Sequence, residues 1–440
     1  MAQYVILVSI PGLRERDLSA MPNLARLAAG GGYATLAPTF PAVTCPVQAN
    51  MTTGKLPREH GVVGNGFYWR DQQRVEMWTA WNDCITRPQI WDVLHERDRS
   101  ITSATWFPLH SKGCGADYIC TPAPIHNPDG SESLWCHTRP ESLYLELKDK
   151  LGHFPLQHFW GPIAGIQSSA WIVASAVLAA QKYRPNFFYI YLPHLDYAAQ
   201  KAGPDSDAAR KSLGELDAEI GKLVEGMEAA YSEAPLWLMA GEYAIAAVDS
   251  VSFPNRVLRK AGLLAVREAD DGEHLDFASK AWALVDHQFS HVFVQGGEAK
   301  IIKRVANLFK KQPGISEVLT GDKLGKYGLD HPRSGDVVLV SEPNSWQAYY
   351  WWEDDAQAPG FARTVDIHRK PGYDPVELFF DPKTKGIPLD ATLVRGSHGA
   401  PVKSSAQQSV LLCSEPGVFV GGQAADVDVA GIVLRQFEIE

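Results

Sequence analysis

The sequence predicts an α/β protein whose mostly parallel central sheet is flanked by helices. Long apolar runs at 4–10, 185–192 and 235–239 have the composition of strands that are buried on both faces. Segments with helical periodicity alternate with these runs, which is the pattern of an α/β fold. Polar residues follow several of the runs, and in such folds functional side chains lie at the carboxyl ends of the strands.

Turn-forming residues bound the elements of the first half of the chain. Pro11-Gly12 ends the first strand, and Gly30-Gly31-Gly32 ends the first helix. A long stretch with prolines, glycines and three cysteines comes later, and a loop of that length is usually functional. In order, we expect a strand at 4–10, a helix at 21–29, a strand at 33–36, a helix that begins at Thr44, a hairpin at 67–82, a helix at 90–96, a strand at 101–106 and an irregular stretch at 107–140.

The second half continues the alternation of helices and strands. We expect helices at 141–151 and 167–183, a strand at 185–192, a helix at 206–231, a strand at 235–239, a helix at 255–261, strands near 263–267, 281–286 and 291–295, a helix at 300–310, a strand at 336–340 and short strands at 409–413 and 418–420. The chain is expected to form one domain over 1–440, with cap or irregular insertions at about 67–160 and 255–365.

The composition is that of a globular protein with an acidic balance. The chain has 440 residues, of which 45% are hydrophobic and 21% charged, and its net charge is −10. That balance argues against a nucleic acid polymer or an acidic membrane as partner. No run of about 20 apolar residues is present, so no membrane span is expected. An acidic protein that handles phosphates needs local positive charge, which a bound metal ion can supply.

The N-terminus and the cysteines predict a cytoplasmic protein. Met1-Ala2-Gln3 leads directly into the first strand without a basic region or a small-residue cleavage site. The six cysteines show no CxxC spacing, and without an export signal they are expected to be reduced thiols. The oligomeric state is not predicted.

The stretch from Pro38 to Asn50 runs from an extended segment into a short helix. Pro38 and Pro41 favour extended geometry before them, Thr44 suits the N-cap, and Pro46 suits the first helical turn. Free amides at a helix N-terminus can hold an anion. A threonine hydroxyl there could attack phosphorus if a metal ion or a neighbouring base lowered its pKa, although an ordinary capped helix explains the same residues.

Several short segments, taken together, resemble the alkaline phosphatase superfamily in its type I phosphodiesterase/nucleotide pyrophosphatase-like branch. The resemblance covers most of the chain and depends on the order and spacing of these segments. They are Ser9–Arg14, Met21–Leu24, Thr39–Thr44, His60–Val62 with Asn65, Tyr191–Asp196 with Gly203-Pro204, Ala261–Leu263 and Arg395–Gly399. The resemblance implies an alkaline-phosphatase-like fold and hydrolysis of a small-molecule phosphate ester.

The resemblance also implies roles for individual residues. In this family a threonine or serine attacks phosphorus in line, and two zinc ions about 4 Å apart activate it and stabilise the leaving oxygen. Thr44 matches that nucleophile, and Asn65 matches the asparagine that binds a phosphoryl oxygen. Asp196 and His398 match ligands of one metal ion.

Four positions depart from the family pattern, so the metal site is divergent. Pro11 replaces an aspartate, Gln200 replaces a histidine, and Glu242-Tyr243 replaces an Asp-His pair. Glutamate can still bind a metal ion, whereas proline cannot and tyrosine rarely does. We therefore expect Glu242 to substitute as a ligand.

Other residues could rebuild such a site. His194 lies two residues before Asp196, and the two would share a face if the strand continued. Asp286-His287-Gln288 ends a buried run, and Asp366-Ile367-His368 places a carboxylate and an imidazole at strand spacing. With His368 as a further ligand, such a mixed set suits Zn²⁺, or alternatively Mn²⁺, as one or two ions. Each of these groups, taken singly, is more simply a hydrogen-bonded polar residue, and Cys45 is more simply an inert buried thiol.

Two functions therefore remain open. The first is a metal-dependent hydrolase of a phosphodiester or pyrophosphate bond, with Thr44 as nucleophile and Asn65 as donor to the phosphoryl oxygen. The second is a catalytically altered member of the family that binds a phosphorylated metabolite or serves a biosynthetic pathway. An acyl hydrolase is disfavoured because no G-x-S-x-G motif is present. Tryptophans 78 and 81 and the aromatic run 346–352 suggest a stacked ring or apolar group, although core packing explains them as well.

Overall fold

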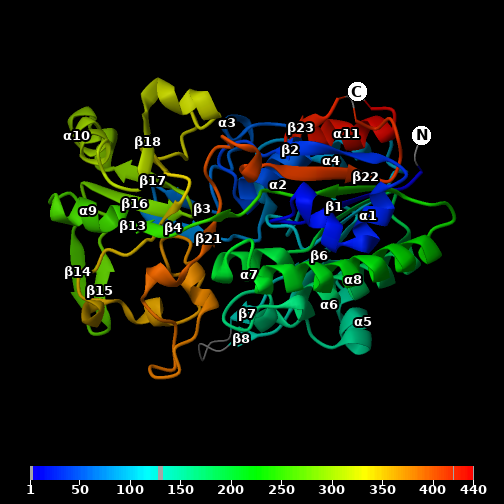
Figure 1. Cartoon of the computed structure of the whole chain (residues 1–440), viewed down its shortest axis with the longest axis horizontal. Helices are drawn as coiled ribbons and strands as arrows, with labels where there is room; N and C mark the ends of the chain where they lie inside the picture. Colours follow the sequence, from blue (N-terminus) through cyan, green and yellow to red (C-terminus); the bar gives the residue numbers. More distant parts are fainter. Residues whose placement is uncertain (1–2, 127–131, 420, 440) are drawn as a thin grey trace.

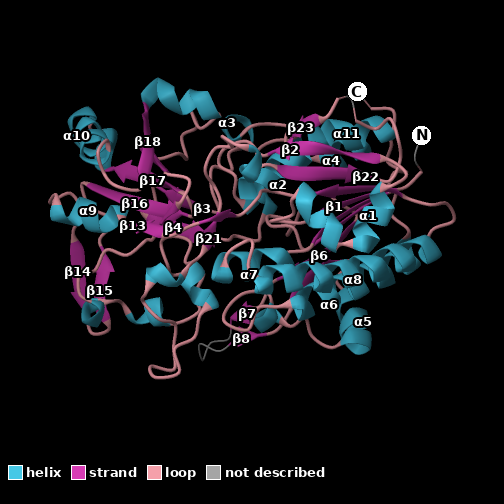
Figure 2. Ribbon diagram, viewed as in Figure 1, coloured by secondary structure: helices cyan, strands magenta, loops and turns pink. Residues whose placement is uncertain are grey.

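A nine-stranded mixed sheet forms the centre of the larger part of the molecule, and a four-stranded antiparallel sheet lies beside it (Figures 1 and 2). The structure is a computed structural model that describes residues 3–126, 132–419 and 421–439. The α/β fold class is confirmed. The α-helices are α1 Pro22–Ala28, α2 Thr44–Thr53, α3 Pro57–His60, α4 Ile90–Arg97, α5 Leu143–Leu151, α6 Ile166–Tyr183, α7 His194–Ala202, α8 Asp207–Ala230, α9 Pro254–Lys260, α10 Ala299–Phe309 and α11 Asp428–Gln436.

The large sheet has the order β23-β2-β22-β11-β1-β10-β5-β6-β9. Its strands are β1 Val5–Ser9, β2 Gly32–Ala37, β5 Ser103–Trp106, β6 Tyr118–Pro122, β9 Cys136–Arg139, β10 Phe187–Tyr191, β11 Leu236–Ala240, β22 Ser409–Cys413 and β23 Gln423–Ala425. The five strands from β11 to β6 are parallel, and β22 and β9 run antiparallel to their neighbours. Strand β1 is buried throughout, as its continuous apolar sequence requires.

Helices cover both faces of the large sheet. Helices α1, α6 and α8 pack with one face of the strands, and α2, α4 and α11 pack with the other (Figure 1). No helix of the described chain is long and apolar enough to cross a bilayer. All six cysteines are buried and unpaired.

The remaining strands form small sheets at one end of the large one. The four-stranded sheet has the order β16-β17-β19-β18 and its own apolar core, which includes most of the aromatic run 346–352. The strands are β3 Gly66–Trp69, β4 Arg74–Met77, β7 Ile125–His126, β8 Glu132–Ser133, β12 Ala246–Ala247, β13 Ser250–Ser252, β14 Val266–Ala269, β15 Gly272–Leu275, β16 Ala281–Asp286, β17 Phe289–Val294, β18 Ile315–Thr320, β19 Val337–Ser341, β20 Ser345–Gln347 and β21 Gly396–Ser397.

Three sequence-based expectations about the strands were wrong. His194 and Asp196 do not extend strand β10, because helix α7 begins at His194. The stretch 107–140 is not irregular throughout, since it contains β6 to β9; residues 127–131 lie outside the described residues. The last strand is β23, rather than 418–420, of which residue 420 lies outside the described residues.

A buried carboxylate fixes helix α2 against the end of the chain. Asp426 lies between β23 and α11 and accepts hydrogen bonds from the Thr39 amide at 3.1 Å and from Asn50 Nδ2 at 2.7 Å. His60 Nε2 is 2.7 Å from Asn50 Oδ1, so three segments meet at one helix. Complete burial raises the pKa of Asp426 to about 6, although its hydrogen bonds oppose that shift.

This raised pKa predicts a pH-dependent stability. The folded chain binds the Asp426 proton more tightly than the unfolded chain, so the contribution is complete below about pH 4 and is lost as the pH rises through about 6. Urea unfolding of the wild type and Asp426→Asn should therefore show a difference in unfolding free energy that falls by about 2 kcal/mol between pH 4 and pH 7. The exposed Asp428→Asn serves as control, and parallel profiles for wild type and Asp426→Asn would contradict the assignment.

Candidate functional site

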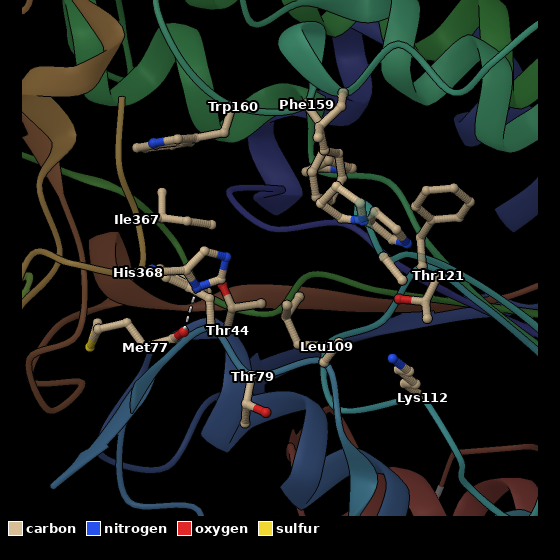
Figure 3. A pocket seen from close by; sticks show the side chains of 18 of the residues that line it. Thr44, Met77, Thr79, Leu109, Lys112, Thr121, Phe159, Trp160, Ile367 and His368 are labelled. Carbon is tan, nitrogen blue, oxygen red and sulfur yellow. Dashed lines mark hydrogen bonds between the residues drawn. The ribbon is translucent and has the colours of Figure 1, made fainter. Parts of the chain in front are cut away.

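A cavity of about 930 Å³ opens beside the carboxyl ends of the central strands (Figure 3). Its floor includes Thr44, Asp196 and Tyr243, and its walls are largely aromatic. The aromatic and apolar wall residues include Trp78, Trp81, Phe107, Leu109, Trp135, Phe159, Trp160, Tyr197 and Tyr373. Trp78 and Trp81 thus reach the cavity, whereas the run 346–352 does not line it and packs in the core of the small sheet instead.

Thr44 is the first residue of α2, and Val43 rather than Thr44 occupies the N-cap. The extended segment before the helix delivers the threonine to the cavity floor, where Figure 3 shows it. Its Oγ1 lies 3.0 Å from the hydroxyl of Tyr243. That hydroxyl also donates to Asp196 Oδ1 at 3.5 Å, so one phenol links the threonine to a buried carboxylate.

Asp196 lies in the first turn of α7 and is held by a chain of hydrogen bonds. Gln200, one turn later, donates from Nε2 to Asp196 Oδ2 at 2.5 Å. Tyr373 in turn donates from its hydroxyl to Gln200 Oε1 at 2.7 Å. Complete burial raises the pKa of Asp196 to about 7, against the opposing effect of the hydrogen bonds from Gln200 and Tyr243.

His398 follows β21 and lies in a column of four rings. The ring of Tyr243 stacks on it with centroids 3.6 Å apart and planes at 6°, and His287 lies on its other side at 3.9 Å. Tyr373 closes the column by stacking on His287 at 3.6 Å. His398 Nδ1 donates to the Ala42 carbonyl at 2.8 Å, which leaves Nε2 as the acceptor nitrogen. Nε2 is 3.9 Å from Asp196 Oδ1, and burial lowers the pKa of His398 well below its usual value.

Glu242 and His368 have hydrogen-bond partners other than Asp196 and His398. Glu242 follows β11, and its Oε1 accepts hydrogen bonds from the hydroxyl of Ser9 and from Gln48 Nε2. Burial raises the pKa of Glu242 to about 8. His368 lies on the cavity wall, where its Nδ1 is 3.2 Å from the Met77 carbonyl (Figure 3). The expected four-ligand set is therefore not assembled, and the described residues contain no group of three or more His, Cys, Asp or Glu side chains arranged to hold a metal ion.

Asn65 connects the start of α2 to the small sheet. Its Oδ1 accepts from the Cys45 amide at 3.0 Å, and its Nδ2 donates to Asp286 Oδ1 at 3.0 Å. Its backbone amide donates to Asp286 Oδ2 at 2.7 Å. One Nδ2 hydrogen remains for another acceptor. The Cys45 thiol is buried and its pKa is raised well above its usual value, so it lacks the thiolate character of a nucleophile.

Of the residues offered for a rebuilt site, only the Asp286-His287 pair reaches the ring column. His287 occupies the turn between β16 and β17 with φ of +56°, an uncommon conformation for a residue other than glycine. Its Nδ1 is 2.6 Å from Asp286 Oδ1. Asp366 pairs instead with Arg369, and His194 pairs with Glu215 at 3.0 Å.

Sequence reasoning missed Tyr373 and the part that Gln200 and Tyr243 play together. Tyr373 is separated from Gln200 by 173 residues, and no local pattern marks it. Lys112 was also missed; its Nζ lies 4.2 Å from the ring centroid of Trp81 on the cavity wall. A cation over an aromatic face beside a cavity could bind an anionic group of a ligand.

The chain resembles known proteins along most of its length. Residues 5–374 match the type I phosphodiesterase/nucleotide pyrophosphatase family. An uncharacterized pyrophosphatase/phosphodiesterase of Schizosaccharomyces pombe is 23% identical over 235 residues, which cover 51% of this chain and 41% of that protein. Ectonucleotide pyrophosphatase/phosphodiesterase 1 of Saccharomyces cerevisiae is 24% identical over 243 residues, which cover 51% of this chain and 31% of that protein. Each match thus spans less than half of the relative's own length.

Solved structures show the same fold. Phosphonoacetate hydrolase from Sinorhizobium meliloti 1021 in complex with phosphonoformate superposes with a TM-score of 0.64, at 14% identity, over 98% of this chain and 96% of that one. The same enzyme in complex with phosphonoacetate gives a TM-score of 0.65 at 15% identity. The match over residues 5–374, with which the alkaline-phosphatase-like sheet agrees, shows that this chain belongs to the type I phosphodiesterase/nucleotide pyrophosphatase family of the alkaline phosphatase superfamily.

Proposed function

We propose that this protein hydrolyses a phosphodiester or pyrophosphate bond of a small molecule and that Thr44 is the attacking group. The observation that carries the proposal is the position of Thr44. Its hydroxyl lies on the cavity floor, at the first residue of a ten-residue helix, and is hydrogen-bonded to Tyr243. A nucleophilic hydroxyl next to a group that can relay its proton is the usual arrangement for covalent catalysis.

The hydrogen bonds define a path for the proton of Thr44. As its oxygen bonds to phosphorus, the threonine proton moves to the phenol oxygen of Tyr243, and the phenol proton moves to Asp196 Oδ1. The bond from phosphorus to the leaving oxygen breaks, and the proton held on Asp196 passes to that oxygen. Water then attacks phosphorus and gives its proton to Asp196, while the released Thr44 oxygen regains a proton through Tyr243. Tyr243 stays neutral in the resting site, because burial raises its pKa well above the usual value. The remaining Nδ2 hydrogen of Asn65 is the donor proposed for a phosphoryl oxygen.

No step of the proposed reaction uses the divalent cation, zinc or manganese, that the sequence predicts. The family is typically metal-dependent. In this chain, however, Asp196 and His398 meet a phenol and an amide rather than further ligands, and Glu242 faces Ser9 and Gln48. No step is therefore assigned to a metal ion.

The cavity walls favour a substrate with a large apolar or aromatic group. The tryptophans around the cavity offer stacking surfaces, and Lys112 offers a positive charge beside Trp81. A small phosphate ester with one bulky ring fits this lining better than a nucleic acid polymer, which the net charge of −10 also disfavours.

A second function is favoured by the same hydrogen bonds. Gln200 and Tyr243 occupy two positions where the family places ligands, and each is bonded to Asp196. A protein that retains the cavity but not the ligands could bind a phosphorylated metabolite without hydrolysing it. Thermal shift with nucleotides and sugar phosphates, measured beside turnover, separates this binder from the hydrolase.

Removal of the Thr44 hydroxyl should stop the reaction. With bis-p-nitrophenyl phosphate as substrate, Thr44→Ala should lower kcat/KM by roughly 1,000-fold or more, because the attacking oxygen is removed. Thr53→Ala, at the other end of the same helix, should leave kcat/KM within about twofold of the wild type, because Thr53 does not line the cavity. Two results would contradict the hydrolase proposal. One is equal turnover by Thr44→Ala and the wild type. The other is a wild type that shows no turnover under any condition, whether in EDTA or with an added metal.

Removal of the Trp81 ring from the cavity wall should weaken substrate binding. Trp81→Ala should raise KM for bis-p-nitrophenyl phosphate about three- to tenfold with little change in kcat, since a stacking contact made equally before and during reaction is lost. KM for methyl p-nitrophenyl phosphate should change less. Tyr33 is 51% exposed, as is Trp81, but it is not among the cavity-lining residues, so Tyr33→Ala is the matched control. A change in kcat alone would exclude Trp81 as a substrate contact.

A further inference from the structure

We infer that Gln200 and Tyr243 replace metal ligands in this chain, so that its site is closed by hydrogen bonds, and that imidazoles at these two positions would make it bind zinc. The inference goes beyond the proposed function and does not depend on whether Thr44 turns over substrate. It depends on four side chains: Asp196, Gln200, Tyr243 and His398.

Gln200 presents a donor where a ligand would have to present a lone pair. Residues 196 and 200 are one turn apart on α7 and therefore share a face of that helix. The Gln200 amide is oriented by the Tyr373 hydroxyl, which bonds to Oε1 at 2.7 Å and leaves Nε2 pointing at Asp196 Oδ2 at 2.5 Å. An amide nitrogen carries no lone pair for a metal ion. The carboxylate that would bind a cation is satisfied by a neutral donor instead.

Tyr243 fills the space between Thr44 and Asp196. Its hydroxyl lies 3.0 Å from Thr44 Oγ1 and 3.5 Å from Asp196 Oδ1, and its ring stacks on His398 at 3.6 Å. A cation shared by Thr44 and Asp196 would have to displace that hydroxyl. Displacement would also break the ring column, because Tyr243 is buried and its ring lies parallel to His398.

The second position of the family's metal pair keeps one carboxylate oxygen, Glu242 Oε2, which is buried and has no hydrogen-bond partner among the described residues. Pro11 supplies no side-chain donor, and Glu242 Oε1 is held by Ser9 and Gln48. Gln48 is itself fixed, because its Oε1 accepts from the Leu109 amide at 2.7 Å. Glu242 Oε1 is therefore held by partners on two separate segments, β1 and α2, and moving it toward Thr44 would leave those partners unsatisfied.

His398 retains the arrangement of a metal-binding histidine. Its Nδ1 donates to the Ala42 carbonyl, so Nε2 carries the lone pair. Nε2 is buried, has no hydrogen-bond partner among the described residues, and lies 3.9 Å from Asp196 Oδ1. One carboxylate and one imidazole thus remain in place, and two more nitrogen ligands would complete a four-coordinate set of the kind that zinc prefers.

The experiment compares three full-length proteins, each loaded with ZnCl₂, desalted and analysed for bound zinc by inductively coupled plasma mass spectrometry. They are the wild type, Gln200→His/Tyr243→His, and Gln200→Asn/Tyr243→Phe as the matched control without ligating groups. The histidine variant should hold about one zinc ion per chain and gain several degrees in Tm that EDTA removes. The wild type and the control variant should hold only a background level and show no response of Tm to EDTA.

Two results would overturn the inference. The first is about one zinc ion per chain in the wild type that is lost in Asp196→Ala, because the existing residues would then hold the metal. The second is a folded histidine variant, verified by circular dichroism, with no more zinc than the control variant. If the histidine variant does not fold, the wild-type zinc content and its dependence on Asp196 still decide the question. Turnover is not measured, so failure of the hydrolase proposal would leave these results unaffected.

Discussion

The cost of burying carboxylates at the end of the central sheet constrains the whole site. Asp196, Glu242 and Asp286 are all buried, and desolvation raises the pKa of each, to about 7, 8 and 6. No lysine or arginine is paired with any of the three in the described chain. The protein offsets this cost with neutral donors: amides from Gln48, Asn65 and Gln200, and hydroxyls from Ser9 and Tyr243.

That constraint explains why the departures from the family pattern occur together. A carboxylate that loses a metal ion must gain hydrogen bonds or a proton, since an unpaired buried charge is expensive. Asp196 gains Gln200 and Tyr243, and Gln200 gains Tyr373. The four-ring column of Tyr243, His398, His287 and Tyr373 then packs around these bonds. The substitutions at 200 and 243 thus belong to one connected network with residue 373.

Short motifs predicted the positions of the central residues but not their partners. Thr44, Asp196 and His398 were assigned through the family resemblance. The structure places Thr44 and Asp196 on the cavity lining and His398 Nε2 3.9 Å from Asp196 Oδ1. Glu242 and His368 were expected there too, but their orientation depends on Ser9, Gln48 and Met77, which lie far away in the sequence. The helical start at His194 was missed because the apolar run before it hides the end of the strand.

Through His287, the four-stranded sheet contributes to the lining of the cavity. This residue sits at the tight turn between β16 and β17, and its neighbour Asp286 receives both hydrogen bonds from Asn65. Sub-global opening of those four strands would therefore withdraw one ring of the column and the anchor of the α2 loop in a single event. The nine-stranded sheet could keep its backbone ladder throughout. Such a molecule would retain most of its protected amides in hydrogen exchange but would have no intact cavity. The lifetime of the cavity would then be set by the four-stranded sheet.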